Sequence, residues 1–187
     1  VMLADALLET PETVARVIAG HEKSGAVATL LTSELESPDG LGRVVRDHSG
    51  KITEVVEEAV ASQAQKAIFE TNGGIAAFQA DWLWPALREL SPSPSGEYYL
   101  TDLAKMAAGA GLLVSSVGSV EAYGIQGVND RVQLAQAERV MRERILRRWM
   151  LAGVTVVDPS TTYIDADVTL GKDTTIHPNT SVAGRSR

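Results

Sequence analysis

Seven residues are of types that can hold a cation or a polar ligand. Most of them end an apolar run or precede a helical pattern: Asp5, Gly42, Glu57, Asn72, Tyr99, Thr101 and Asn129. Carboxylate and amide oxygens suit magnesium, which also keeps waters and substrate phosphates as ligands. Amides and hydroxyls can both donate to and accept from a sugar. The sequence contains no nucleophile elbow, Walker loop or dinucleotide fingerprint.

Asp5 and Asn129 are the candidate metal ligands. Asp5 follows the apolar run "VMLA", which we expect to be a buried strand, and ligands collect at the carboxyl ends of strands in open α/β sheets. The alternative is a turn or helix-capping aspartate. Asn129 directly precedes the longest helical pattern, where the positive end of the helix favours polar and anionic groups. The alternative is an ordinary N-cap.

Gly42, Glu57 and Asn72 are candidate ligand-binding residues. Gly42, in "DGLGR", would let the backbone approach a base or sugar, or would simply form a hairpin turn. Glu57 follows the two valines of "EVV" and is either a carboxylate that accepts from sugar hydroxyls or a solvated strand end. Glu58 would point to the opposite face, so that only one of the two can enter a site. Asn72, in "TNGG", is either a sugar-binding amide or a turn residue.

Tyr99 and Thr101 lie in "GEYYLTD", just before a helical pattern. In an extended segment they would share one side, where a ring and a hydroxyl could orient a sugar. The alternative is a helix start, with Thr101 as the cap and Tyr99 in the core.

Strand-like and helix-like runs alternate along residues 1–153, which predicts an α/β layer architecture. We expect the first helix to be capped by Thr10, to have Pro11 in its first turn and to end at Gly25. We expect the long helix that follows Asp130 to end at Gly153. After Gly153 the helical signal disappears. We therefore expect a domain boundary there, with one domain over 1–153 and another over 154–187.

The tail repeats with a period of six, since aliphatic residues stand at Ile164, Leu170, Ile176 and Val182. Such hexads predict a parallel β-helix with these side chains stacked inside. The alternative is a coincidental spacing in a β-rich tail. Four hexads make little more than one coil, and coils need neighbours for stability.

Composition narrows the class further. The net charge of −7 and pI near 5.0 disfavour a nucleic-acid partner. No apolar run approaches the roughly 20 residues of a membrane span, and "VMLADALLET" lacks the features of a signal peptide. The absence of cysteine fits a reducing compartment, so we expect a cytoplasmic protein. The chain opens on Val1 within a strand-like run and stops five residues after Val182, so we expect it to be the middle of a longer protein.

The order of several phrases carries a family resemblance: "GLGR", "VVEE", "TNGGI", "GEYYLTD", "GVNDRVQLAQAE" and "GVTVVDPSTTYID", followed by hexads. This series, which covers essentially the whole chain, resembles the bacterial bifunctional N-acetylglucosamine-1-phosphate uridyltransferase/glucosamine-1-phosphate acetyltransferases. The resemblance implies a partial Rossmann-like nucleotidyltransferase domain followed by the first coil of a left-handed β-helix. It implies an enzyme of cell-wall precursor synthesis that makes UDP-N-acetylglucosamine and pyrophosphate from UTP and N-acetylglucosamine 1-phosphate. In the intact family the β-helix forms a homotrimer and uses acetyl-CoA to acetylate glucosamine 1-phosphate.

The resemblance also implies roles for individual residues. Asp5 and Asn129 match magnesium-binding positions, and Asn129 also contacts product. Product binding is implied for Gly42, Glu57 and Asn72, and the sugar pocket for Tyr99 and Thr101. The sugar phosphate supplies the nucleophilic oxygen, so no catalytic side chain is expected.

Two departures from the family pattern bear on activity. Ala59 and Val60 stand where the family commonly has a Lys-Asp pair, and the family's glycine-rich triphosphate loop would precede Val1. We therefore expect residues 1–187 alone not to catalyse uridyl transfer. The alternatives are another sugar-1-phosphate nucleotidyltransferase, or a non-catalytic, nucleotidyltransferase-like regulatory subunit.

Overall fold

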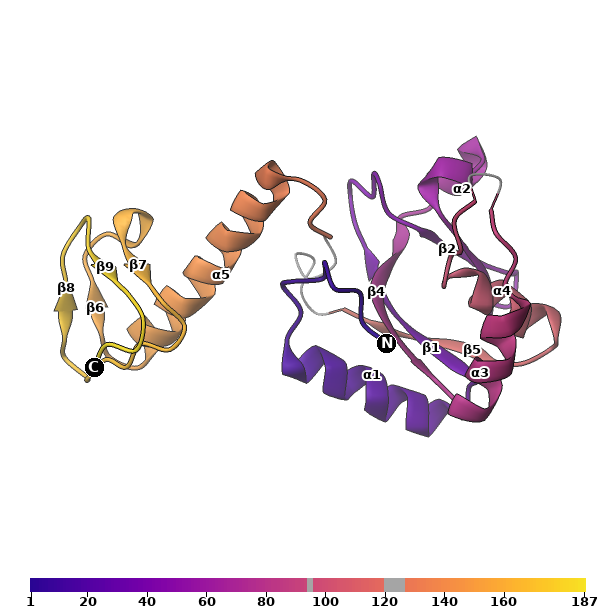
Figure 1. Ribbon diagram of the computed structural model, residues 1–187, viewed down its shortest axis with the longest axis horizontal. Coiled ribbons are helices and arrows are strands. Elements are labelled where there is room, and N and C mark those ends of the chain that lie inside the picture. Colours follow the sequence, from indigo (N-terminus) through magenta and orange to yellow (C-terminus); the bar gives the residue numbers. More distant parts are fainter. Residues whose placement is uncertain (94–95, 120–126) are drawn as a thin grey trace. The chain divides into compact units, whose positions relative to one another are not determined.

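The computed structural model describes residues 1–93, 96–119 and 127–187, which form two compact units (Figure 1). The first unit is Val1–Gly127 and the second is Val128–Arg187. None of the helices in the described residues is long and apolar enough to cross a membrane.

The first unit is built on a five-stranded mixed sheet with the order β3-β2-β4-β1-β5. β1 pairs with β5 in parallel, whereas the β1–β4, β4–β2 and β2–β3 pairs are antiparallel. The strands are β1 (Ala28–Glu34), β2 (Arg43–Arg46), β3 (Ile52–Val56), β4 (Glu70–Phe78) and β5 (Val114–Gly118). The expected α/β class is confirmed, although antiparallel pairs outnumber the parallel one.

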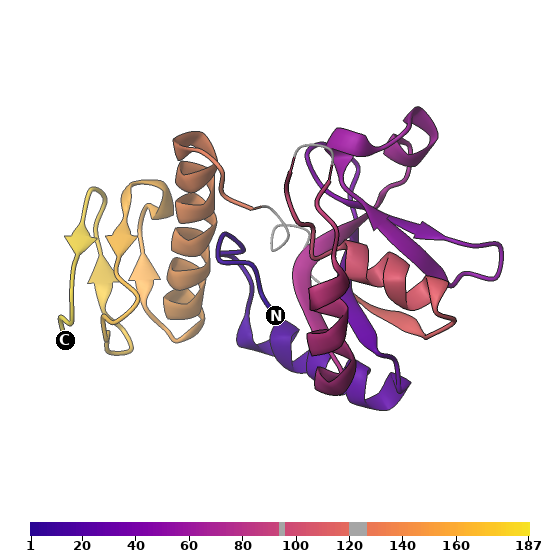
Figure 2. The same cartoon turned by 45° about the vertical axis from the view of Figure 1, so that its right-hand side comes forward.

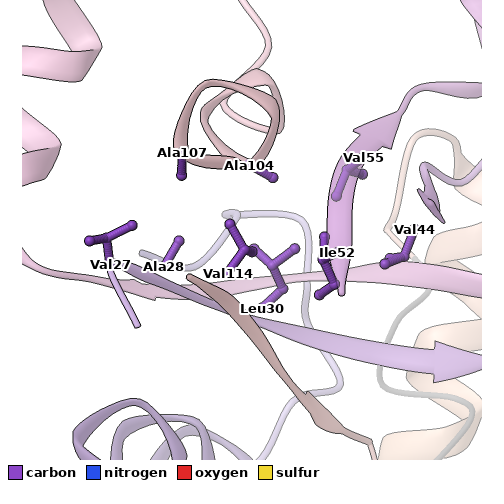
Figure 3. Close-up of a cluster of buried hydrophobic side chains, with 9 residues drawn as sticks. All are labelled: Val27, Ala28, Leu30, Val44, Ile52, Val55, Ala104, Ala107 and Val114. Carbon is purple, nitrogen blue, oxygen red and sulfur yellow. The ribbon is translucent and has the colours of Figure 1, made fainter. Parts of the chain in front are cut away.

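Helices cover both faces of this sheet. On one face α1 (Pro11–Ser24) packs Val17 against Leu31 and Ile75. On the other face α4 (Asp102–Gly109) packs against a cluster of small and branched side chains from the sheet (Figure 3), and α3 (Ala80–Glu89) packs beside α4. The cluster in Figure 3 comprises Val27, Ala28, Leu30, Val44, Ile52, Val55, Ala104, Ala107 and Val114. Two short elements, η1 (Glu58–Val60) and α2 (Gln63–Lys66), follow β3.

The signals at both ends of α1 act as the sequence predicts. The hydroxyl of Thr10 accepts from the backbone N–H of Thr13 at 3.2 Å, and Pro11 opens the helix. Gly25 follows the last helical residue with φ +66°, the left-handed conformation that ends many helices. Local side-chain and backbone chemistry therefore marks both ends of this helix.

The prediction of a buried strand before Asp5 is wrong. Residues 1–4 are exposed and form a single antiparallel bridge, between Met2 and Ile75 of β4. The N–H of Leu3 donates to the carbonyl of Gly74 at 3.0 Å, and the N–H of Ala76 donates to the carbonyl of Val1 at 3.0 Å. An apolar run alone does not distinguish a covered strand from one that lies along an open edge.

The second unit combines α5 (Arg131–Leu151) with short strands that lie alongside it (Figure 2). These are β6 (Thr155–Val156), β7 (Tyr163–Ile164), β8 (Thr175–Ile176) and β9 (Ser181–Val182), with η3 (Pro159–Thr161) between β6 and β7. β6 pairs with β8 and β7 with β9, both in parallel.

The six-residue period corresponds to the inside of the second unit. Ile164 and Ile176 are buried, and Leu170 and Val182 pack against the same cluster. Leu146 of α5 completes that cluster and is 1% exposed. The first compact unit ends at Gly127, so α5 belongs to the same unit as the tail. The expected domain boundary near residue 153 stays a prediction.

Candidate functional site

Three of the candidate residues meet at one end of the sheet, on the face that α4 covers. The N–H of Asn72 donates to the carbonyl of Gly42 at 2.9 Å. A Cβ built on Gly42 would lie 3.3 Å and 3.4 Å from the two carboxylate oxygens of Glu57. Asn72 pairs with Thr32 on β1, two residues beyond Leu30 of the α4-side core, so its side chain shares that face. Residues from three separate strand ends thus form one polar cluster.

Thr101, which directly precedes α4, also belongs to this cluster. Its hydroxyl donates to Oε1 of Glu57 at 2.8 Å and makes no capping bond to the helix. The alternative in which Thr101 serves as a side-chain cap is therefore wrong. Because one Glu57 oxygen accepts from Thr101, the carboxylate is held in one orientation while its other oxygen keeps its capacity to accept.

Tyr99 lies two residues before Thr101 but bonds elsewhere. Its hydroxyl donates to Oε2 of Glu97 at 2.8 Å, and its side chain is partly exposed. The structure therefore brings Gly42, Glu57, Asn72 and Thr101 together, with Tyr99 in the adjoining segment.

Asp5 lies in a turn, half buried, against the backbone of Gly127. A Cβ on Gly127 would come within 2.6 Å of Oδ2 of Asp5, so only glycine permits this approach. Asn129 follows two residues later and belongs to the second unit.

Asn129 is not the cap of α5. Asp130 caps that helix by accepting from the N–H groups of Val132 and Gln133, each at 2.8 Å. The side chain of Gln133 accepts instead from the N–H of Asn129, at 2.6 Å. The capping alternative for Asn129 is therefore wrong, and its exposed amide is not used in capping.

Sequence reasoning missed one residue pair beside the cluster. Arg43, the first residue of β2, is 1% exposed and lies 3.0 Å from Oε2 of Glu58. The same oxygen accepts from the N–H of Gly40 at 2.6 Å. That bond, reinforced by Arg43, holds the pKa of Glu58 below its usual range. The signal that could have revealed the pair was a charged residue, Arg43, directly before the apolar residues Val44 and Val45.

Within the described part of the chain, no group of three or more histidine or acidic side chains could hold a metal ion. A cation here would therefore depend on one or two protein oxygens together with ligand phosphates, the arrangement that magnesium accepts. The cluster can hold a neutral, hydroxyl-rich ligand through a carboxylate, an amide and backbone groups.

Comparisons with known proteins identify relatives of this chain. No family model matches the chain. A protein named Bifunctional protein GlmU from Geotalea daltonii is 42% identical over 185 residues, 98% of this chain and 40% of its own length. A protein of the same name from Shouchella clausii is 42% identical over 187 residues, 100% of this chain and 41% of its own length.

Two solved structures share the fold. One is a CMP-2-keto-3-deoxy-manno-octonic acid synthetase complexed with CTP, with a TM-score of 0.51 and 16% identity over 73% of this chain and 58% of that one. The other is described as a glucose-1-phosphate thymidylyltransferase from Bacillus anthracis, with a TM-score of 0.50 and 19% identity over 67% of this chain and 48% of that one. Identities this low establish the fold alone, a mixed α/β fold. The sequence matches establish the family, because over its whole length this chain is homologous to the bifunctional GlmU proteins, of which it spans about 40%.

Proposed function

We propose that the first unit holds the sugar in a reaction that transfers a uridylyl group from UTP to N-acetylglucosamine 1-phosphate. The observation that carries the proposal is the convergence of Gly42, Glu57, Asn72 and Thr101, which are 59 positions apart from first to last in the sequence. Homology to the GlmU proteins and the nucleotidyltransferase-type fold support it.

Each member of the cluster has a role that its chemistry suits. Glu57, oriented by Thr101, accepts from hydroxyls of the sugar. The Asn72 amide can donate to and accept from an acetamido group. The backbone at Gly42 allows the ligand to approach closely, and Tyr99 borders the same pocket.

The reaction needs positioning more than it needs a reactive side chain. A phosphate oxygen of the sugar phosphate forms a bond to the α-phosphorus of UTP, and the bond from that phosphorus to pyrophosphate breaks. Catalysis of phosphoryl-type transfer comes mainly from alignment and charge stabilisation. The residues described here hold the acceptor sugar so that its phosphate is aligned.

We propose Asp5 and Asn129 as the protein ligands of a magnesium ion. The donor set of one carboxylate and one amide oxygen fits magnesium, and Gly127 keeps the space beside the Asp5 carboxylate free of a side chain. Bound magnesium would neutralise charge on the phosphates. Asn129 would also contact product.

For the second unit we propose the first coil of a left-handed β-helix. Tyr163 pairs with Ser181, a separation of 18 residues or three hexads, and the aliphatic hexad positions lie inside. By homology we propose that the intact protein is a cytoplasmic homotrimer that also acetylates glucosamine 1-phosphate from acetyl-CoA, in cell-wall precursor synthesis.

The first prediction tests the sugar pocket. A chimaera in which this chain replaces the matching segment of the Geotalea daltonii protein should release pyrophosphate from UTP and N-acetylglucosamine 1-phosphate. Asn72→Ala should lower its preference for this substrate over glucose 1-phosphate by roughly tenfold or more, because a polar site discriminates through the bonds it makes. The measurement is the ratio of the two kcat/KM values.

Asn72→Asp is the shape-matched variant, since it keeps one acceptor oxygen but replaces the amide donor with a second, negatively charged acceptor oxygen. An unchanged ratio in both variants would mean that Asn72 is a structural residue. Absence of any uridyl transfer in an otherwise folded chimaera would contradict the proposed function itself.

A further inference from the structure

A buried ion pair lies beside the proposed sugar-binding cluster. It joins Arg43, at the start of β2, to Glu58, which follows β3. Arg43 donates through its two terminal nitrogens, one to the carbonyl of Leu41 and the other to Oε2 of Glu58 at 3.0 Å. Its side chain is 1% exposed, while that of Glu58 is 29% exposed. The pair thus joins a fully buried cation to a partly solvated carboxylate.

The same carboxylate oxygen also holds the glycine-rich turn. The N–H of Gly40 donates to Oε2 of Glu58 at 2.6 Å. The turn is therefore fixed twice, at Gly40 by Glu58 and at Leu41 by Arg43. Gly40 has φ +80° and needs this external support, because glycine has more unfolded conformations to lose than other residues.

This fixed turn determines where the cluster residues lie. Gly42 immediately follows the turn, and its carbonyl receives the N–H of Asn72. Glu57 immediately precedes Glu58, so anchoring Glu58 also anchors the backbone that carries the Glu57 carboxylate. Gly42 and Glu57 are within van der Waals reach of each other, so a small shift of the turn would change the pocket.

The burial of this ion pair carries a desolvation cost that offsets much of its contribution to folding stability. Among the described residues, Nε of Arg43 is buried and finds no hydrogen-bond partner. Buried ion pairs often stabilise no more than apolar residues of similar volume, whereas removal of one partner leaves an unpaired charge. A buried arginine with an unused donor is therefore better explained by what it positions than by folding stability.

We propose that Arg43 and Glu58 are positioning residues that fix the Gly40–Gly42 turn against Glu57, and so set the affinity of the proposed site for its sugar. This inference rests on the proposed function. Neither residue needs to touch the ligand, since both act through the backbone at Gly42 and the carboxylate of Glu57.

The test uses the chimaera with the Geotalea daltonii protein and compares Arg43→Met, Glu58→Leu and the double variant. Each single variant leaves one charge unpaired, so it should lower the melting temperature and raise KM for the sugar phosphate. The double variant should recover the melting temperature but keep a KM roughly tenfold or more above wild type, since misplacement of about 1 Å can cost a hundredfold. The KM for UTP should change much less.

Glu58→Gln gives the conservative rescue, because its amide oxygen still accepts from Gly40 and Arg43. The KM of this variant for the sugar phosphate should stay within about threefold of wild type. A tenfold change would correspond to about 1.4 kcal/mol, so the expected loss of binding free energy is smaller than that. Amide hydrogen exchange at Gly40 and Asn72 in the 187-residue chain gives a second readout. Exchange at both should accelerate in the double variant, without ligand present.

The matched control is the ion pair between Arg46 of β2 and Glu70 of β4, which has N–O distances of 2.6 Å and 2.7 Å. Arg46→Met with Glu70→Leu should leave the KM for sugar phosphate near wild type. A double Arg43/Glu58 variant that recovers both stability and KM would overturn the positioning role while leaving the proposed function intact. A wild-type chimaera with no uridyl transfer would overturn the proposed function, and this inference with it.

Discussion

Because Gly42 has no side chain, its backbone can lie close to Val55 and to the carboxylate of Glu57. Its backbone φ is not in the left-handed region, so a larger residue would not strain the chain there. Space is the constraint instead, because a Cβ would lie 3.2 Å from Val55 and 3.3 Å from Glu57. Contacts this close force a neighbour to move by a few tenths of an ångström. The carboxylate of Glu57 is the freer of the two, because Val55 is buried in the core.

We therefore predict that Gly42→Ala weakens sugar binding more than it weakens the fold. In the chimaera, KM for the sugar phosphate should rise roughly tenfold through displacement of Glu57. The free energy of unfolding should fall by about 1 kcal/mol or less. Gly109→Ala is the control, because no atom lies within 4 Å of a Cβ there. Equal losses of stability and affinity in Gly42→Ala would indicate a folding defect rather than a site effect.

At the scale of elements, β4 carries an irregularity that its two glycines make possible. The register with β1 shifts between Leu30 and Thr32, opposite Gly73 and Gly74. Gly74 has φ +72°, and a Cβ on Gly73 would come within 2.9 Å of the Leu31 side chain. A bulge bends its strand and increases the local twist. Asn72 lies directly beside this bulge, which therefore contributes to where its amide is aimed.

Gly74→Ala should destabilise the first unit by about 1–2 kcal/mol, the cost of a left-handed conformation for a residue with a side chain. Gly74→Asn should cost less, because asparagine visits this region more readily. Urea unfolding followed by hydrogen exchange at β1 and β4 amides would measure both. Equal costs for the two variants would point to crowding against Leu3 instead, whose side chain lies 3.3 Å from a Cβ at this position.

At the scale of the whole molecule, the long helix α5 is part of the core of the second unit. Leu146 is 1% exposed and packs with Val154, Ile164 and Ile176. The short strands of this unit are two residues each, so they have little stability of their own. Packing against α5 supplies the burial that the strands need.

Leu146→Ala should therefore destabilise the second unit by about 2–5 kcal/mol, the range for a buried leucine that leaves a cavity. Amide exchange at Val156, Ile164 and Ile176 in the 187-residue chain would report the loss. Leu134→Ala is a control on the same helix, because that side chain is 48% exposed. Similar effects of both substitutions would mean that α5 does not form the core of this unit.

Local signals determined much of the structure. The caps of α1, the end of α5 and the inward hexad positions all follow from side-chain chemistry or from hydrophobic period, which act over a few residues. The order of short phrases also indicated the family, and with it Gly42, Glu57, Asn72 and Thr101. The α/β class followed from the alternation of strand and helix patterns, whereas the antiparallel pairing within the sheet did not.

Only the tertiary structure decided which residues meet and what covers each element. The run before Asp5 has the same apolar sequence whether it is buried or lies along an edge. Only the structure shows that it pairs with β4 and that its side chains are exposed. Thr101 is a plausible cap by sequence, and only the position of Glu57 reveals its partner. The Arg43–Glu58 pair joins residues 15 positions apart through burial, which no local pattern encodes. Contacts between residues far apart in the sequence depend on how the whole sheet packs, so the sequence could name the candidate residues but not the ion pair beside them.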